Sequence, residues 1–540
     1  MSDEPKTNRQ KVAGFSICNF LFGAIACFCL AACAVGPDYH TPAMKVPDNF
    51  VAAQDKGQKS MELSIDKPVI DAAQWWQRLE DPKLNSLIER AVRNNPDIEI
   101  ALDRMQEART AELVVMGQDL PVAGASAGGG GGTGTDLARG RVAPPLHSAE
   151  NAQGLKEIAG AFGFDAGWEI DLFGKYRRAI EAAQYDSQAA LAARNTVLIS
   201  IIADVARAYI DMRAQQMQLA VLEKNTGVAL DYFNLTRERF ERGITNELDL
   251  SLAKRQLASL QAEKAPLVGQ IHAAQYVIAV LLGEFPEDLA KEFEKPEMIP
   301  QLPEKIDAGI PLDLLRRRPD IQEAERQLAG ATARIGVATA DLFPHLVLSG
   351  AVGYQGQGLG VHPEMLRSIW SIGPSVNWRL LDFGTLDALV DIADLRSREL
   401  LVNYKRTVLN AVREVDTSID SYAAQQDRLH HLNDALAASQ RSVSLATERY
   451  DRGLTDSLNV IDAERQEYNL EQQYVSSHQA AAEQFIALYK ALGGGWEQYQ
   501  SFPPINEPQP AVIAAFRRLL GIERPEVSID EPPDRNSTRP

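Results

Sequence analysis

Residues 238–248 read Glu238-Arg239-Phe240-Glu241-Arg242-Gly243-Ile244-Thr245-Asn246-Glu247-Leu248, and residues 448–458 read Glu448-Arg449-Tyr450-Asp451-Arg452-Gly453-Leu454-Thr455-Asp456-Ser457-Leu458. The second stretch repeats the first at an offset of 453 − 243 = 210 residues. Each stands between two long runs of helix-forming residues. Glycine often follows a helix end, where φ is positive, and Thr with Asn or Asp suits the start of the next helix. The pattern predicts a tight reversal between two helices, made twice.

The duplication extends away from both turns. Apolar residues with helical spacing recur at the same offset, as in Val205 and Val415. The motif Pro96-Asp97-Ile98 recurs as Pro319-Asp320-Ile321 at an offset of 223, so the first copy holds 223 − 210 = 13 extra residues. A chain that repeats itself in this way is built from two copies of one structural unit.

Composition limits the partners and the chemistry of the chain. Its 540 residues carry 55 Lys+Arg and 73 Asp+Glu, and the net charge of −18 argues against nucleic acid as a partner. All four cysteines lie within the first 33 residues, so the body of the chain has no disulfide. No metal, nucleotide-phosphate or acyl-transfer motif occurs in the sequence. We therefore expect no enzyme activity, no cofactor and no metal.

The N-terminus has the pattern of a sorting signal. Lys6, Arg9 and Lys11 precede an apolar stretch at residues 12–32, which ends in Leu30-Ala31-Ala32-Cys33. Small residues before a cleavage point suit a signal peptidase, so residues 1–32 are predicted to be a signal peptide. The alternative is a membrane anchor helix, because about 20 apolar residues can span a bilayer.

Four segments predict strands, because apolar residues alternate there with Gly, acids or other polar residues. They are residues 122–128, 162–172, 346–354 and 372–380. Short segments of this pattern suit a membrane β-barrel, although a soluble sheet with one wet face has the same period. Four strands cannot close a barrel in lipid, so the barrel reading requires other copies of the chain. The Gly128–Gly134 run and Gly356-x-Gly358-x-Gly360 are predicted to be hairpin loops.

Long helices are predicted on both sides of each turn. Residues 176–242 and 386–452 contain no Pro and keep helical spacing, so each should form a helix of about 100 Å. Residues 247–282 and 457–492 should form the returning helices, the first kinked or broken at Pro266. A soluble coiled-coil rod would satisfy the helices alone, but it does not account for strands at one end of both hairpins.

Several motifs along the chain resemble one family. Leu30-Ala31-Ala32-Cys33 resembles a bacterial lipobox, and Gly36-Pro37-Asp38-Tyr39, Trp75-Trp76, Asp81-Pro82 and Asn95-Pro96-Asp97 follow it in order. Together they resemble the TolC/OprM-type outer-membrane efflux lipoproteins, NodT-like proteins that serve resistance–nodulation–division pumps. The resemblance implies a mainly α protein with a small β part. It also implies a homotrimer in which long helical hairpins form an α-barrel and four strands per chain form a shared 12-stranded transmembrane β-barrel.

The resemblance also implies roles for particular residues. Cys33 would be the lipidated first residue of the mature chain. Tyr450, Asn459 and Asp462 would lie at the pore constriction, where Asn459 replaces an Asp that some members carry. The turns would face a periplasmic adaptor protein; their residues are Arg242, Gly243, Ile244, Thr245, Arg452, Gly453, Leu454 and Thr455.

The predicted organisation follows from these features. Residues 1–32 are the signal peptide, 33–300 the first repeat, 301–495 the second repeat, and 496–540 a C-terminal equatorial segment with a disordered tail. The expected function is a passive outer-membrane duct of a tripartite efflux system in a Gram-negative bacterium, whose partners are the adaptor, the inner-membrane pump and outer-membrane lipid. The alternative is a structural lipoprotein that spans the periplasm without transport.

Overall fold

The computed structural model describes residues 34–47, 50–51, 62–64, 72–132, 157–303, 305–307, 317–358 and 367–499. The chain divides into two compact units, Met1–Gly495 and Trp496–Pro540. In the second unit the described part consists of residues 496–499, with the short helix η5 (Glu497–Tyr499). The predicted signal peptide, Cys33 and most of the predicted C-terminal segment lie outside the described residues.

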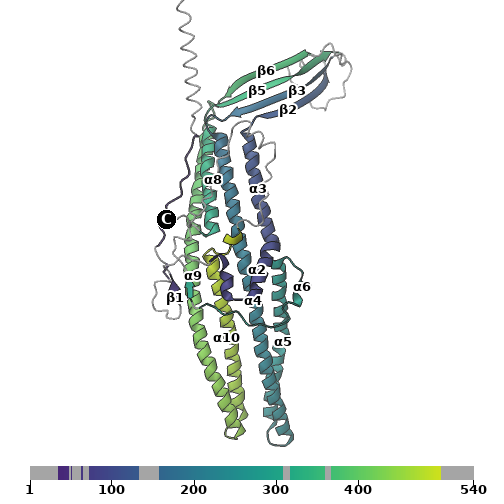
Figure 1. Ribbon diagram of the computed structural model, residues 1–540, viewed down its shortest axis with the longest axis vertical. Coiled ribbons are helices and arrows are strands. Elements are labelled where there is room, and N and C mark those ends of the chain that lie inside the picture. The colour runs from purple at the N-terminus through teal and green to yellow at the C-terminus, as the bar shows by residue number, and fades with distance from the viewer. Residues whose placement is uncertain are drawn as a thin grey trace, which may run out of the picture. The chain divides into compact units, whose positions relative to one another are not determined.

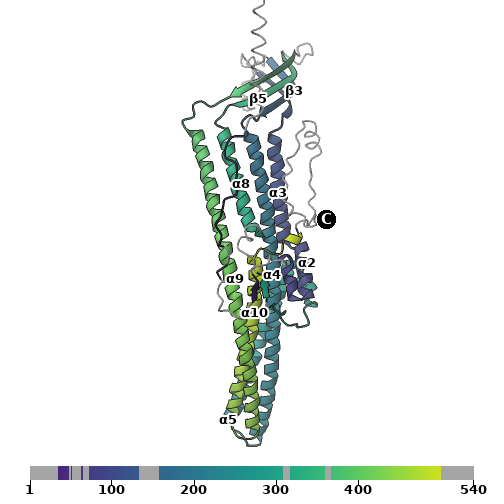
Figure 2. The same cartoon turned by 60° about the vertical axis from the view of Figure 1, so that its left-hand side comes forward.

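Four long helices form the two predicted hairpins (Figures 1 and 2). They are α4 (Lys175–Glu241), α5 (Glu247–Leu282), α9 (Thr385–Asp451) and α10 (Ser457–Ala491). Both α4 and α9 have 67 residues, which corresponds to about 100 Å of helix. Helix α4 packs against α5, α9 packs against α10, and α10 also packs against α4. The predicted hairpins are confirmed, with ends within one residue of those expected.

The predicted break at Pro266 is wrong, because α5 continues as one helix from Glu247 to Leu282, while the kink stays a prediction. A proline inside a helix removes the hydrogen bond to the carbonyl four residues earlier, here that of Ala262. Both residues are exposed on the outer surface of α5, so water can bind that carbonyl instead. The helix therefore continues through the proline.

The predicted four strands are confirmed, and they form one antiparallel sheet in the order β2-β3-β5-β6. The strands are β2 (Val122–Gly132), β3 (Glu157–Ile170), β5 (His345–Gly358) and β6 (Arg367–Asn377). Strand β3 of the first repeat pairs with β5 of the second, with Phe164 opposite Val352 and Val352 opposite Trp370. The sheet thus joins the two repeats within one chain.

The glycine runs are not hairpin loops where the structure describes them, so that prediction is wrong. Residues 128–132 belong to β2, and Gly356 and Gly358 belong to β5. Ladder hydrogen bonds join backbone to backbone, so a strand needs no side chain once a neighbour pairs with it. Strands also come very close at glycines here, since a Cβ on Gly163 would meet the carbonyl oxygen of Val352 at 2.6 Å.

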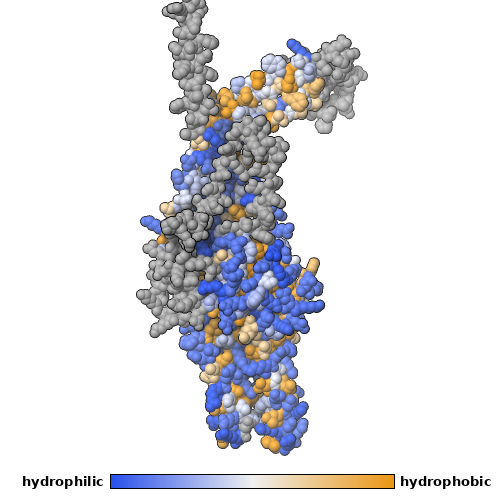
Figure 3. All heavy atoms as spheres, in the orientation of Figure 1, coloured by the Kyte–Doolittle hydropathy of each residue, from blue (hydrophilic) through white to orange (hydrophobic). Residues whose placement is uncertain are grey.

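One face of the sheet is apolar and exposed. The register places large apolar side chains of three strands on this face, and Figure 3 shows such side chains gathered on the sheet; they are Phe162, Phe164, Val352, Tyr354, Trp370, Ile372 and Val376. The opposite face carries small or polar residues such as Asp165, Ser349 and Ser371. The chain leaves the apolar face without any cover among its described residues.

The sheet and the two turns lie at opposite ends of the helices (Figure 1). Helix α3 (Pro96–Gln118) leads into β2, and α8 (Pro319–Ala340) leads into β5. Strands β3 and β6 lead directly into α4 and α9. The reversals at Gly243 and Gly453 follow about 67 helical residues later, so they lie about 100 Å from the strand ends.

Each returning helix meets the start of a second helix through one capping residue. The Nδ2 of Asn95 donates to the carbonyl oxygen of Leu281 at 2.7 Å, and its Oδ1 accepts from the first turn of α3. In the second repeat, Arg318 donates to the carbonyl oxygen of Ala491 at 2.9 Å. Leu281 and Ala491 are 210 residues apart, so the same junction occurs twice.

Shorter elements surround the middle of the helices and form an equatorial layer. We define this layer as η1 (Ala72–Leu79), α2 (Pro82–Asn94), α6 (Pro286–Ala290) and residues 293–303. Trp75 stacks on Tyr489 with ring centroids 5.8 Å apart, and the hydroxyl of Tyr209 donates to Asp81 at 2.7 Å. The strands β1 (Glu62–Ser64) and β4 (Lys305–Asp307) form a separate parallel pair.

Replacing Asn95 should destabilise the first junction. Asn95 is 3% exposed, so Asn95→Ala leaves two α3 amide groups and the Leu281 carbonyl without partners, at a cost of about 2–4 kcal/mol. Asn95→Ser keeps a capping oxygen and should cost about half as much. Unfolding of the detergent-solubilised protein, followed by circular dichroism, measures both; equal effects of the two variants would contradict the capping role.

Candidate functional site at the helix turns

The two turns have the same backbone geometry. Gly243 and Gly453 have φ values of +72° and +70°. In each turn the glycine amide donates three residues back, to Phe240 or Tyr450, and the next amide donates five residues back. These are paired C-terminal hydrogen bonds of the kind that require a residue with positive φ after the helix. The repeated sequence therefore folds into a repeated turn.

The predicted adaptor-facing residues lie at the exposed ends of the hairpins. Ile244 and Leu454 are exposed at equivalent positions, and no core covers either of them among the described residues. Arg242 and Arg452 pair within their own helix ends, with Glu238 at 3.7 Å and Glu448 at 2.5 Å. The tips thus combine an apolar side chain with charged neighbours.

The starts of the returning helices differ between the repeats. Asn246 accepts a hydrogen bond from the amide of Asp249, and the hydroxyl of Thr245 donates to the same aspartate. Asp456 makes no side-chain cap, and the hydroxyl oxygen of Thr455 is buried without a partner among the described residues. The second turn is held by fewer local hydrogen bonds than the first.

Tyr450, predicted at the constriction, contacts the other hairpin. Arg239 near the end of α4 donates a hydrogen bond to the Tyr450 hydroxyl, and its guanidinium lies 4.8 Å from the tyrosine ring centroid. A cation over an aromatic face is attracted by the ring quadrupole. This contact joins the ends of α4 and α9, so it links the two hairpins next to their turns.

Asn459 and Asp462, the other two predicted constriction residues, lie one turn apart on α10, and both are exposed. The carboxylate of Asp462 lies 3.5 Å from Arg465 on its own helix. Neither side chain contacts Tyr450 within the described chain. The structure therefore brings Tyr450 to Arg239 and leaves Asn459 and Asp462 open to solvent.

Charged and hydroxyl groups take part in joining the two hairpins between the tips and the equatorial layer, alongside the ring of Tyr468, which also packs against apolar side chains of the first hairpin. The ammonium of Lys224 on α4 lies 2.6 Å from Glu471 and 3.6 Å from Glu467 on α10. The Tyr468 hydroxyl donates to Glu263 on α5 at 2.7 Å. We call these contacts, together with Arg239 and Tyr450, the seam.

The interior of the first hairpin is different from the seam. Leu222 and Ala229 of α4 pack against Leu257 and Leu260 of α5 in a buried cluster. Burying apolar side chains stabilises a contact by about 25 cal/mol per Å², whereas exposed ion pairs contribute about 0–1 kcal/mol each. The helices within this hairpin are therefore held more firmly than the two hairpins are held to each other.

Sequence reasoning missed Glu464, which lies on the face of α10 that carries Glu467 and Glu471. Burial, and then the charge of Glu467, raise the pKa of Glu464 to about 7. A signal was present in the sequence, because Val460, Glu464, Glu467, Glu471 and Val475 follow helical core spacing with acids at three successive positions.

The segment that follows Cys33 is attached where the sheet meets α4. Ala34 lies against Gly174 so closely that a Cβ there would meet its Cα at 2.6 Å, and the amide of Val35 donates to Phe173 at 3.0 Å. Arg178 holds the segment through Val35 and through an ion pair with Asp38 at 2.6 Å. The equivalent glycine of the second repeat, Gly384, has open space at its Cβ position.

Within the described residues, no group of three or more His, Cys, Asp or Glu could hold a metal ion. Two helices, α4 and α5, contain a window long and apolar enough to cross a membrane, and 61% of the α4 window is buried inside the chain. Burial of that kind fits a core helix as well as a membrane helix.

Known proteins resemble this chain along most of its length. The model of the family described as "Outer membrane efflux protein" matches residues 87–284 and 310–494. Nodulation protein T of Rhizobium leguminosarum bv. viciae is 28% identical over 497 residues, which cover 92% of this chain and 96% of that protein. The probable efflux pump outer membrane protein TtgC of Pseudomonas putida is 30% identical and covers 88% of this chain and 95% of its own.

Solved structures share the fold. The outer-membrane channel OprN has a TM-score of 0.75 and 32% identity, and the match covers 86% of this chain and 100% of OprN. The open state of the Neisseria gonorrhoeae MtrE outer membrane channel has a TM-score of 0.69 and 26% identity, and the match covers 86% of this chain and 98% of MtrE.

Glu464 should make stability depend on pH near neutrality. Its pKa in the folded chain lies above the ordinary value of 4.5, so burying the charged form lowers stability as pH rises from about 4.5 through 7. Glu464→Gln should match the wild type at pH 5 and melt about 2 °C or more above it at pH 8. Melting in detergent at both pH values measures this, with Asp462→Asn as the exposed control on the same helix; an equal gain at both values would contradict it.

Proposed function

The chain belongs to the family of outer membrane efflux proteins and functions as an outer-membrane channel of a tripartite pump, and we propose on that premise that it works as a homotrimer gated at its helix turns. The observation that carries the proposal is the combination of an exposed apolar sheet with two open edges at one end and a charged seam between hairpins at the other. Substrate would pass through the bore without any chemical step.

The sheet supports insertion into lipid. Its apolar face suits hydrocarbon, and its small and polar face suits a water-filled bore. Strands β2 and β6 form the outer edges, have 11 residues each, and run in opposite directions. The β6 edge of one copy can therefore pair antiparallel with β2 of the next, and three copies give 3 × 4 = 12 strands with no open edge.

Equivalent positions of the two repeats support a ring of copies. Ala192 and Ile199 on α4 are 4% and 6% exposed, whereas Val402 and Leu409, which lie 210 residues later on α9, are 64% and 68% exposed. Helix α4 packs against α8 of the other repeat, but no helix of the other repeat covers α9 in the same way among the described residues. A neighbouring copy would supply that cover with its α3, in the way that α8 covers α4.

The seam supports gating by movement of whole hairpins. The hairpins can separate at their tips by exchanging charged contacts for water, while the apolar cluster inside the first hairpin stays intact. The contact between Arg239 and Tyr450 would hold the closed state. Asp462 of three copies would ring the same axis and attract cations, with Asn459 beside it.

The turns support an adaptor contact. Exposed apolar side chains at the tips of both hairpins suit a partner surface, although single exposed apolar residues are common. The surface would consist of Arg242, Gly243, Ile244, Thr245, Arg452, Gly453, Leu454 and Thr455. A periplasmic adaptor and an inner-membrane pump of the resistance–nodulation–division type would complete the assembly.

The attached N-terminal segment supports lipidation at Cys33. Ala34 lies where β3 gives way to α4, so an acyl chain on the preceding residue would enter the membrane at the level of the strand ends. The intact mass of the mature chain, compared with that of Cys33→Ser, measures the modification; a wild-type mass without acyl groups would remove this part of the proposal.

Removing the link between the tips should open the channel. Arg239→Ala loses both the hydrogen bond and the cation–ring contact, so its conductance in planar bilayers should rise several-fold, whereas Tyr450→Phe keeps the ring and should give a smaller rise. Arg242→Ala also removes one positive charge, but Arg242 pairs only with Glu238 of its own helix among the described residues, so this variant is the matched control. Equal conductance of Arg239→Ala and wild type would exclude the link from the gate.

Cation block tests the place of Asp462 in the same recordings. Asp462→Asn should weaken block by divalent cations at the periplasmic side at least several-fold, because a ring of carboxylates is lost. Asp427→Asn, on the exposed surface of α9, is the control. A strain that lacks the gene should become more sensitive to pump substrates; normal sensitivity together with no conductance would favour a structural lipoprotein without transport.

A further inference from the structure

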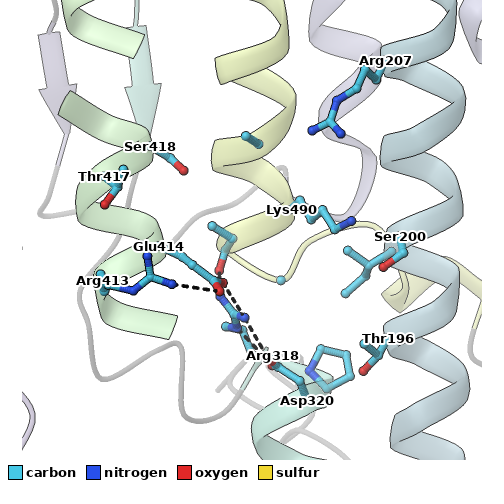
Figure 4. A pocket seen from close by; sticks show the side chains of 15 residues that line it. Thr196, Ser200, Arg207, Arg318, Asp320, Arg413, Glu414, Thr417, Ser418 and Lys490 are labelled. Carbon is cyan, nitrogen blue, oxygen red and sulfur yellow. Dashed lines mark hydrogen bonds and ion pairs between the residues drawn. The ribbon is translucent and has the colours of Figure 1, made fainter. Parts of the chain in front are cut away.

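A pocket of about 330 Å³ lies where four helices meet, at the second helix junction, where Arg318 contacts the end of α10. It is lined by α4, the first residues of α8, α9 and the last turns of α10 (Figure 4). Its volume is at the lower end of the range for small-molecule sites. Apolar side chains of Ile199, Pro319 and Ala487 share the lining with charged ones, so the pocket offers both kinds of contact.

The charges of the pocket do not balance. Arg318 is buried and satisfied, since it pairs with Asp320 at 2.6 Å and with Glu414 at 2.9 Å and donates to the Ala491 carbonyl. Arg207 and Lys490 also line the pocket, and neither has a side-chain hydrogen bond or ion pair within the described part of the chain. Two positive groups are therefore left over in a protein whose net charge is −18.

Arg413 on the opposite wall brings the lining to four basic and two acidic side chains, a net charge of +2. It lies 3.8 Å from Glu414, whose other oxygen already accepts from Arg318. In Figure 4, Arg207 and Lys490 reach into the space between α4 and α10, apart from the group formed by Arg318, Asp320 and Glu414. A ligand anion could bind both groups without disturbing that network.

The charge of Arg207 partly offsets the raised pKa of the neighbouring Glu483, but no ion pair joins Arg207 to an acid among the described residues. Asp211 and Glu483 lie next along α4 and α10, bridged by the Gln479 amide, which donates to each at 3.0 and 2.9 Å. Burial, and then the hydrogen bond and charge of Asp211, raise the pKa of Glu483.

The pocket faces away from the equatorial layer. Arg207 precedes Tyr209 by two residues, about 200° around the helix, and Tyr209 points to Asp81 of the layer. On α9, Val415 is fully buried. Arg413 and Thr417, each two residues from Val415, are exposed and line the pocket, so they lie on the other side of the helix. In a tube the layer must lie outside unless it fills the bore, so the pocket lies on the inner wall. This placement, unlike the binding itself, rests on the proposed function.

We propose that this pocket binds a small organic anion, one with a carboxylate or sulfonate group and a compact apolar body. Arg207 and Lys490 hold the anionic group, and the apolar lining receives the rest. Charge-assisted hydrogen bonds are about twice as strong as neutral ones, so the charge of the ligand decides the affinity. Three copies would place three such sites around the bore, on the route of the exported substrate.

Binding of 2-naphthalenesulfonate to the full-length detergent-solubilised trimer, measured by calorimetry, tests the proposal. Arg207→Gln combined with Lys490→Gln should weaken binding about tenfold or more. Lys405→Gln with Arg441→Gln removes the same charge from exposed positions of α9 and should leave binding unchanged. The neutral analogue naphthalene-2-sulfonamide should bind the wild type as weakly as the sulfonate binds the pocket variant, and this comparison needs no variant to fold.

Each outcome decides the matter. Equal sulfonate affinity in the pocket variant and the wild type, equal affinity of sulfonate and sulfonamide for the wild type, or no sulfonate binding to the wild type would overturn the pocket. Conductance of the same preparations in planar bilayers is recorded in parallel. A conducting channel without sulfonate binding leaves the proposed function intact, and sulfonate binding without conductance leaves the pocket intact.

Discussion

The rest of this structure depends on the unpaired edges of its sheet. Strands β2 and β6 each present a row of backbone N–H and C=O groups that no described residue of the same chain pairs. In hydrocarbon such groups find no water, and each one left unsatisfied costs several kcal/mol. The exposed apolar positions on α9, which match buried positions on α4, likewise need cover from another copy of the chain. A single copy of the chain is therefore incomplete along its whole length.

The contrast between the hairpin interior and the seam decides which parts can move. Apolar contacts between α4 and α5 lose their contribution as soon as water enters. The ion pair of Lys224 with Glu471 can be exchanged for water when the hairpins separate, because Lys224 is already exposed and separation would expose the buried Glu471. Movement along a polar contact between two firm bodies is a common form of conformational change. The chain thus confines its weak contacts to the surface that an opening tip must cross.

Much of the fold could be predicted because two signals are strong in the sequence: a repeat at 210 residues and unbroken helical spacing. The errors have local causes. The glycine run of β2 has no side-chain period, and its strand exists only because β3 pairs with it. Pro266 is exposed, so water can take the place of its missing hydrogen bond and the helix need not break. The turns were found from sequence, whereas Lys224, Arg239 and Arg207 were not, because their partners lie more than 200 residues away or, for Arg207, are assembled by a pocket of four helices.

The two helix junctions also govern the order in which the chain can fold. Helix α8 begins at residue 319, but the helix end on which Arg318 rests, at Ala491, is made about 170 residues later. Arg318 therefore lacks this partner until nearly all of the polypeptide has been synthesised. Contacts so distant in sequence close slowly and leave apolar surface open in the meantime. We therefore expect α8 to reach its final packing only after the C-terminal end of α10 has been made.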